Sequence, residues 1–145
     1  CPIWFLLEEG RIWFTPRQHS EWLKHLRRDP RVALCIDEQS VPYRKVLVRG
    51  RAEIVHEVGQ DDLWRDRYRR IAQRYLAHGD ANAYVDGTDD QPRALCAITL
   101  ETAEVKTWRM PVTGESYDGI WAKRYWTDEA KVRQAAPQVF DKGVD

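Results

Sequence analysis

The chain has 145 residues, and its 23 Lys or Arg balance its 23 Asp or Glu, so the formal net charge is zero. A chain of this length can bury a core of its own, which predicts a single domain over residues 1–145. Balanced charge argues against a nucleic-acid or membrane-surface partner, and no apolar run approaches the ~20 residues of a membrane span.

The first predicted elements are two short runs of bulky apolar residues, Ile3–Leu7 and Arg11–Phe14. Between them, Gly10 stands where a tight turn needs positive φ, so the pair is predicted to form a β-hairpin. The sequence has no Met at its start and opens inside a strand-like run. We therefore expect further residues to precede Cys1 in the natural protein.

An amphipathic helix is predicted next. The Thr15–Gln18 sequence fits a capping box with Pro16 in the first helical position, and a start nearer Ser20 is the alternative. Helical spacing places three apolar side chains on one face: Trp22, Leu23 and Leu26. Pro30 disfavours helix at the residue before it, so the helix is expected to end there.

Two strands are predicted after this helix. Residues 32–37 alternate apolar with small or polar side chains, which is typical of a half-buried strand. Tyr43–Val55 is predicted to be a long strand in which Gly50 marks a bend or bulge. Cys35 and Cys96 lie in apolar runs without CxxC spacing. They are expected to be buried thiols, which suits a reducing cytoplasm.

The second half of the chain predicts helices and then strands. Gly59–Ala77 has apolar residues at helical spacing, and Ala81–Val85 is predicted to be a short helix. Strands are predicted over Arg93–Leu100 and Glu104–Trp108. From about residue 110 to 145 the pattern predicts an irregular tail with a mobile end. These elements favour a small antiparallel barrel decorated with helices over a parallel sheet.

Hydrogen-bond donors gather in the turn that follows the hairpin. Thr15 and Ser20 offer hydroxyls, His19 an imidazole and Arg17 a guanidinium, and a helix start adds free backbone N–H groups. This donor set suits a phosphate, so a phosphate-bearing cofactor is the first functional hypothesis. The alternative is an ordinary helix cap with solvated charges.

Two other places in the sequence could contribute to a site. Lys45, beside Arg44, could supply a second cation to the same anion, or it could be part of a solvated strand edge. Trp108 could form a wall for a flat ring, and Arg109 could stack on that ring or bond to its oxygens. The alternative for this pair is core or subunit-interface packing.

Common catalytic and metal motifs are missing from the sequence. The four histidines show no metal-ligand spacing, so no metal site is predicted. The sequence also lacks GxSxG, GxGxxG and P-loop patterns, which leaves hydrolase chemistry without a visible site.

A resemblance to a known family rests on WFLLEEGRIWFTPRQHSEWLKHLRRDPRVALCID, followed by PYRKVLVRGRAEIV. These segments resemble the pyridoxamine-phosphate-oxidase-like family of flavin-binding split-barrel proteins. The resemblance covers about residues 2–56 well and residues 93–109 loosely. Its most specific part is the Asp-Pro-Arg-Val junction between helix and strand.

The resemblance implies a mainly β fold, a six-stranded antiparallel split barrel with flanking helices. It also implies an obligate homodimer with two FMN sites at the subunit interface. By position, the residues implied for the phosphate are Thr15, Arg17, His19 and Ser20. Those implied for the flavin ring are Ile3, Trp4 and Phe5, with Trp108 and Arg109 of the partner subunit.

Three departures from the family pattern stand out. Many members place a lysine that grips the phosphate where this chain has Trp22, so Arg17, His19 or Lys45 must compensate or the phosphate site is weakened. The family's opening strands are absent before the hairpin. The pyridoxal-specific C-terminal arginine and histidine pattern is not evident, so vitamin salvage is not the predicted function.

The leading hypothesis is therefore a cytoplasmic FMN-dependent oxidoreductase with a small-molecule substrate, in which a deazaflavin is the alternative cofactor. The alternative function is a non-catalytic module that binds flavin, deazaflavin or haem, or a structural dimer without cofactor.

Overall fold

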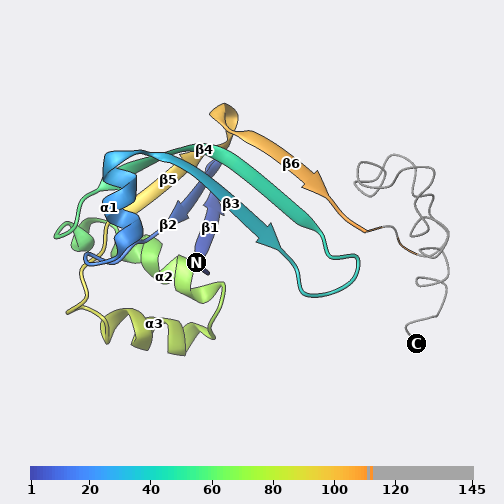
Figure 1. Cartoon of the computed structure of the whole chain (residues 1–145). Helices are drawn as coiled ribbons and strands as arrows, with labels where there is room; N and C mark the ends of the chain where they lie inside the picture. The colour runs from blue at the N-terminus through green and yellow to red at the C-terminus, as the bar shows by residue number, and fades with distance from the viewer. Residues whose placement is uncertain (111, 113–145) are drawn as a thin grey trace. The chain divides into compact units, whose positions relative to one another are not determined.

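The computed structural model describes residues 1–110 and 112, and the predicted tail lies almost wholly outside them. In chain order the elements are β1 (Phe5–Glu8), β2 (Arg11–Phe14), α1 (Glu21–Arg28), β3 (Arg31–Asp37), β4 (Lys45–His56), α2 (Arg65–Gln73), α3 (His78–Asp86), β5 (Leu95–Thr99) and β6 (Glu104–Trp108) (Figure 1). Short 3-10 helices span Asp61–Leu63 and Leu100–Thr102.

Contacts among the described residues define two compact units. The first contains Cys1–Ala33 and Val48–Glu104, and the second contains Leu34–Leu47 and the described residues from Val105 onward. The predicted single domain over residues 1–145 stays a prediction.

The strands form one six-stranded sheet in the order β1-β2-β5-β4-β3, and β6 pairs with β4. The β1–β2, β2–β5 and β4–β5 pairs are antiparallel. Through the described residues this path of paired strands is open and ends at β1 and β3. The predicted antiparallel six-stranded architecture is confirmed.

The hairpin turn between β1 and β2 is made by Glu9 and Gly10. Both have positive φ, 55° and 69° respectively. A two-residue turn with this geometry matches the twist of the flanking strands. The predicted hairpin is therefore confirmed, although its first strand begins at Phe5 rather than at Ile3.

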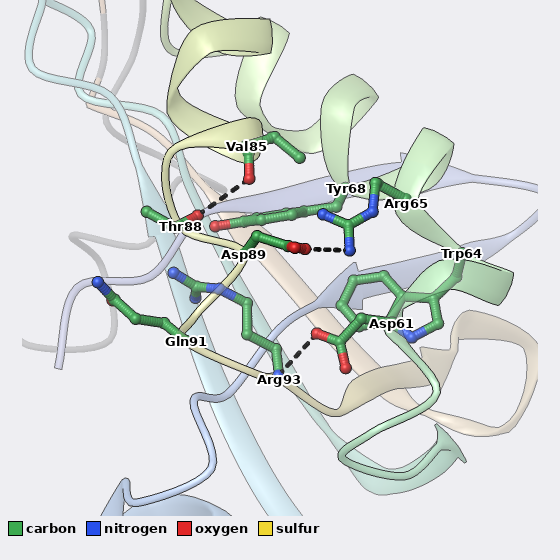
Figure 2. A pocket seen from close by; sticks show the side chains of 9 residues that line it. All are labelled: Asp61, Trp64, Arg65, Tyr68, Val85, Thr88, Asp89, Gln91 and Arg93. Carbon is green, nitrogen blue, oxygen red and sulfur yellow. Dashed lines mark hydrogen bonds and ion pairs between the residues drawn. The ribbon is translucent and has the colours of Figure 1, made fainter.

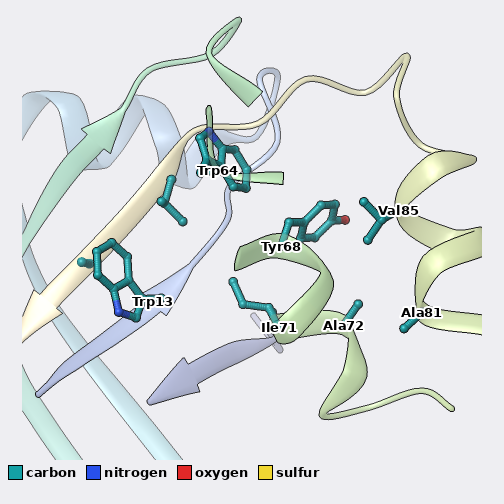
Figure 3. Close-up of a cluster of buried hydrophobic side chains, with 9 residues drawn as sticks. Trp13, Trp64, Tyr68, Ile71, Ala72, Ala81 and Val85 are labelled. Atoms are coloured by element: carbon teal, nitrogen blue, oxygen red, sulfur yellow. The ribbon is translucent and has the colours of Figure 1, made fainter. Parts of the chain in front are cut away.

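The core of the first unit lies where α2 and α3, side by side in Figure 1, cover one face of the sheet. Trp13 of β2 faces this layer, and Figure 3 shows it with the helix residues that form the cluster. The buried cluster consists of Trp13, Trp64, Tyr68, Ile71, Ala72, Ala81, Val85, Leu95 and Ala97. Because side chains alternate along a strand, Phe14 points to the opposite face, where its ring centroid lies 5.8 Å from that of Trp22.

The long helix predicted over Gly59–Ala77 is shorter in the structure. A 3-10 turn comes first, and α2 begins only after Trp64, whose φ of −136° and ψ of 15° are not helical. Burial of the Trp64 ring in the core accompanies this break. By contrast, α3 is longer than the predicted Ala81–Val85.

The start of α1 follows the alternative prediction. Ser20 is its N-cap residue and the helix begins at Glu21, so a helix starting at Pro16 is wrong. The reason is long-range pairing, because the residues before Ser20 bond to the segment that precedes β5.

Two expectations about strand residues are corrected. Cys35 is exposed rather than buried, because it alternates with the half-buried Leu34 and Ile36 along β3, whereas Cys96 is buried as predicted. The irregularity in β4 lies between Ile54 and His56 rather than at Gly50. Gly50 instead permits a close approach, since a Cβ there would lie 3.0 Å from Cγ2 of Ile98.

Candidate functional site

The candidate site is built where the β2–α1 connection meets the segment before β5. Gln18 N donates to Pro92 O at 2.9 Å, and Ala94 N donates to Pro16 O at 3.0 Å. These bonds form an antiparallel bridge between Arg17 and Arg93. Arg17 and Arg93, which are far apart in the sequence, are therefore adjacent residues on two paired segments.

A cleft of about 630 Å³ opens beside this bridge. Six residues predicted from the sequence line it, namely Ile3, Trp4, Thr15, Arg17, Ser20 and Trp22. Six lining residues were not predicted for a site: Cys1, Pro2, Tyr68, Tyr75, Tyr84 and Arg93. The structure thus brings the predicted phosphate turn and the residues before β1 to one cavity.

Aromatic rings form one wall of the cleft. Trp4 stacks on Tyr75 with a centroid distance of 5.2 Å and an interplanar angle of 5°, and it lies 5.1 Å from Tyr84 at a tilt of 54°. A wall of this kind suits a flat, partly apolar ligand.

Phe5 is not among the residues that line the cleft. Its main-chain N–H donates to the Tyr75 hydroxyl at 3.2 Å, and its carbonyl accepts from Arg74 at 2.6 Å. The Arg74 guanidinium also lies 4.1 Å from the centre of the Phe5 ring. Phe5 therefore anchors β1 to the end of α2.

The polar side of the cleft contains two guanidiniums. Arg93 is 7% exposed, and it donates to Thr15 O at 3.3 Å and to the Tyr84 hydroxyl at 3.4 Å. Arg17 donates to the same hydroxyl at 3.5 Å. Within the described part of the chain, no carboxylate forms an ion pair with either arginine. The cleft is therefore positively charged.

The two tyrosines beside these arginines have opposite pKa shifts. Burial raises the pKa of Tyr68 to about 12. Burial also pushes the pKa of Tyr84 upward, but the neighbouring Tyr68 hydroxyl and the guanidiniums of Arg17 and Arg93 outweigh it, so the pKa of Tyr84 is lowered. The lowered pKa of Tyr84 therefore reflects its hydrogen bond with Tyr68 first and the two guanidiniums second.

The remaining residues of the predicted turn have distinct surroundings. The Ser20 hydroxyl donates to Arg17 O at 2.7 Å, which stabilises the turn. His19 is exposed and lines an adjoining cavity of about 350 Å³ that also contacts Arg17 and Asp90. Trp22 is half-buried on the first turn of α1, where its ring lies against Phe14.

Three predicted residues belong to the second unit and are described within it. Lys45 begins β4, and its Nζ lies 4.0 Å from the Asp37 carboxylate. Trp108 is half-buried at the end of β6. Arg109 donates to the main-chain oxygen of Met110 at 3.2 Å.

Sequence reasoning missed Arg93 and Tyr84 because their role depends on pairing between distant segments. Tyr68 and Tyr75 lie within the predicted Gly59–Ala77 helix and were not predicted for a site. Tyr68 is buried, whereas Tyr75 is 40% exposed. The local signal for Arg93 was its place directly after Pro92 and before an apolar strand.

Comparisons with known proteins identify the family and the fold. The sequence profile described as pyridoxamine 5′-phosphate oxidase matches residues 1–108, so the chain belongs to that family. The crystal structure of the conserved hypothetical protein Rv2991 from Mycobacterium tuberculosis is similar, with a TM-score of 0.57 and 22% sequence identity. The similarity covers 80% of this chain and 74% of that one. Among curated proteins, none matches the chain significantly.

The fold is therefore the split barrel of this family, as the sequence resemblance implied. The split barrel of this family is a flavin-binding fold. Two further observations concern residues 1–110 and 112. None of their helices is long and apolar enough to cross a membrane. Within the same residues, no group of three or more His, Cys, Asp or Glu is arranged to hold a metal ion.

Proposed function

We propose that the protein binds a phosphorylated flavin, FMN or a deazaflavin, in the cleft and acts as an oxidoreductase on a small-molecule substrate. One observation carries the proposal. The phosphate turn and the aromatic residues before β1, both expected from the sequence to contact FMN, line the same cavity of about 630 Å³. Pockets for cofactors commonly enclose about 300–1,000 Å³.

The side chains present fit such a cofactor. Arg17, Thr15 and Ser20 stand at the polar end, where a phosphate group would find cationic and hydroxyl partners. Trp4 and Tyr75 offer an aromatic wall for the ring system. A bound flavin supplies the redox chemistry, and the residues of the cleft bind it, orient it and exclude water from it.

A homodimer is part of this proposal. Trp108 and Arg109 of the partner subunit would then complete the ring site, and Lys45 would add a cation to the phosphate. Analytical ultracentrifugation tests this part separately, since a monomer at micromolar concentration would contradict it.

Reconstitution of the purified protein with FMN tests the proposal. We expect quenched flavin fluorescence, a shifted visible spectrum and a Kd in the micromolar range or below. Arg17→Ala should weaken FMN binding about tenfold, because a charge-assisted bond contributes about 1.5 kcal/mol. Arg51→Ala, at an exposed position on β4, is the matched control. Absence of FMN binding at tens of micromolar would overturn the proposal.

A second candidate function is a non-catalytic module that binds flavin, deazaflavin or haem, or a structural dimer without cofactor. The observation that favours it is Trp22, which stands where many family members have a phosphate-binding lysine. Reduction of the loaded protein by a nicotinamide or reduced-deazaflavin donor, followed by turnover with an electron acceptor, separates the two functions. A module without catalysis would bind its ligand but not turn over.

A further inference from the structure

Arg93 is a buried cation without a charged partner in the described residues. Its side chain is 7% exposed, its Nε has no hydrogen-bond partner, and its other two nitrogens reach only neutral oxygens, at 3.3 and 3.4 Å. A buried charge is unfavourable unless it is paired. The guanidinium lines the cleft, so a partner for it can come from a ligand.

The two carboxylates that line a small cavity together with Arg93, those of Asp61 and Asp89, have other partners. Figure 2 shows Asp61 bonded to the main chain of Arg93 rather than to its guanidinium, with an N–H to Oδ1 distance of 2.9 Å. The other oxygen of Asp61 accepts from Gly59 N at 3.2 Å. Asp89 pairs with Arg65. Asp61 thus holds the main chain at Arg93, and Asp89 is paired with another arginine. Neither carboxylate neutralises the Arg93 guanidinium, which can therefore pair with an anionic ligand.

Two further groups point to the same ligand chemistry. Arg17 contributes a second guanidinium without a carboxylate partner in the described residues, and Tyr84 accepts a bond from both arginines. Tyr84 is thus the hydroxyl that both guanidiniums share, and it also lies beside the Tyr68 hydroxyl. Two positive charges beside a hydroxyl match a dianion better than a monoanionic carboxylate.

We propose that Arg93, Arg17 and Tyr84 form the anion subsite of the cleft and that this subsite takes a phosphate monoester group. The inference deepens the proposed function and rests on it for the nature of the whole ligand. It also moves the phosphate from His19 and the start of α1, where the sequence alone placed it, toward the bridge between the β2–α1 connection and β5.

Titration with inorganic phosphate tests the subsite directly. At matched ionic strength, phosphate but not chloride should raise the unfolding temperature in a saturable way, and calorimetry should give a Kd. Arg93→Gln should weaken phosphate binding at least tenfold, and Tyr84→Phe about two- to fivefold. Arg51→Gln is the control for lost surface charge, and its phosphate affinity should equal that of the wild type.

The outcomes separate binding from a structural role. If Arg93 only supports Thr15 and Tyr84, Arg93→Gln lowers the unfolding temperature but keeps the phosphate Kd, which would overturn the proposal. Absence of phosphate binding by the wild type would also overturn it. If Arg93→Gln does not fold, Arg17→Gln provides the same test, with an expected loss of at least fivefold.

Competition identifies the source of the phosphate group. If the group belongs to the cofactor, FMN excludes inorganic phosphate and riboflavin does not. If it belongs to the substrate, the FMN-loaded protein still binds phosphate, and Arg93→Gln weakens that binding. Both results support the subsite. Phosphate binding without any FMN binding would reject the proposed function and leave the subsite intact.

Discussion

The ring of Trp4 lies parallel to the ring of Tyr75, with centroids 5.2 Å apart and planes inclined by 5°. Tyr75 follows the end of α2, and its hydroxyl accepts a hydrogen bond from Phe5 N at 3.2 Å. One side chain thus holds both the aromatic wall of the cleft and the first residue of β1.

The stacking and the hydrogen bond of Tyr75 can be separated by substitution. Tyr75→Leu should lower the free energy of unfolding by about 1–2 kcal/mol, because it removes both contacts. Tyr75→Phe keeps the ring and should lose less than about 1 kcal/mol. Urea unfolding followed by tryptophan fluorescence measures both values. Equal losses in the two variants would show that the stacking contributes nothing.

Ile71 tests the core between the sheet and α2. It is 0% exposed, so Ile71→Ala should lower the free energy of unfolding by about 2–5 kcal/mol through lost burial and a cavity. Leu63→Ala is the control, because Leu63 is 70% exposed and should change stability by no more than about 0.5 kcal/mol. Similar effects in both variants would contradict the assigned core.

The raised pKa of Tyr68 predicts a loss of stability in alkali. The phenol has a pKa of about 12 in the folded protein against 10.0 for an ordinary tyrosine, so the unfolded chain releases this proton first. Its contribution is therefore complete below pH 10 and declines between pH 10 and about 12, by at most about 1.4 kcal/mol per pH unit.

Urea unfolding at a series of pH values measures this decline. Tyr68→Phe should show a shallower fall in the unfolding free energy above pH 10, whereas Leu63→Ala, at an exposed position without a titrating group, should keep the wild-type slope. A Tyr68→Phe slope equal to that of the wild type would contradict burial as the cause of the shift.

Trp22 marks the departure from the lysine that many family members carry. Trp22→Lys adds a cation to the rim of the cleft and should strengthen FMN binding about three- to tenfold, which corresponds to about 0.6–1.4 kcal/mol. Riboflavin lacks the phosphate, so its affinity should not rise. A parallel gain for both ligands would mean that the new lysine acts on the ring rather than on the phosphate.

The strands were predicted best where the signal is local. Arg11–Phe14 and Glu104–Trp108 have the predicted bounds, since alternation and turn residues define them. The break of the predicted helix at Trp64 was not foreseen, because burial of that indole against the sheet overrides helical spacing. Tertiary packing therefore decided where α2 begins, whereas local pattern decided the bounds of these two strands.

The site was also predictable only where its residues lie close together in the sequence. Thr15, Arg17 and Ser20 were found from their types and spacing within one turn, and the cleft includes them. Arg93 joins them only because its backbone pairs with Arg17 across 76 positions of sequence, an association that no local pattern contains. His19, the fourth member of the predicted phosphate turn, contacts the adjoining cavity instead.

The bridge between residues 17 and 93 has an evolutionary consequence. Its two bonds, Gln18 N to Pro92 O and Ala94 N to Pro16 O, use only main-chain atoms, and both acceptors belong to prolines. The pairing of the two segments at this bridge therefore does not depend on which side chains stand at 17 and 93. A change of ligand preference at this site could thus arise at Arg17, which is exposed, without loss of the main-chain bonds that join the two segments.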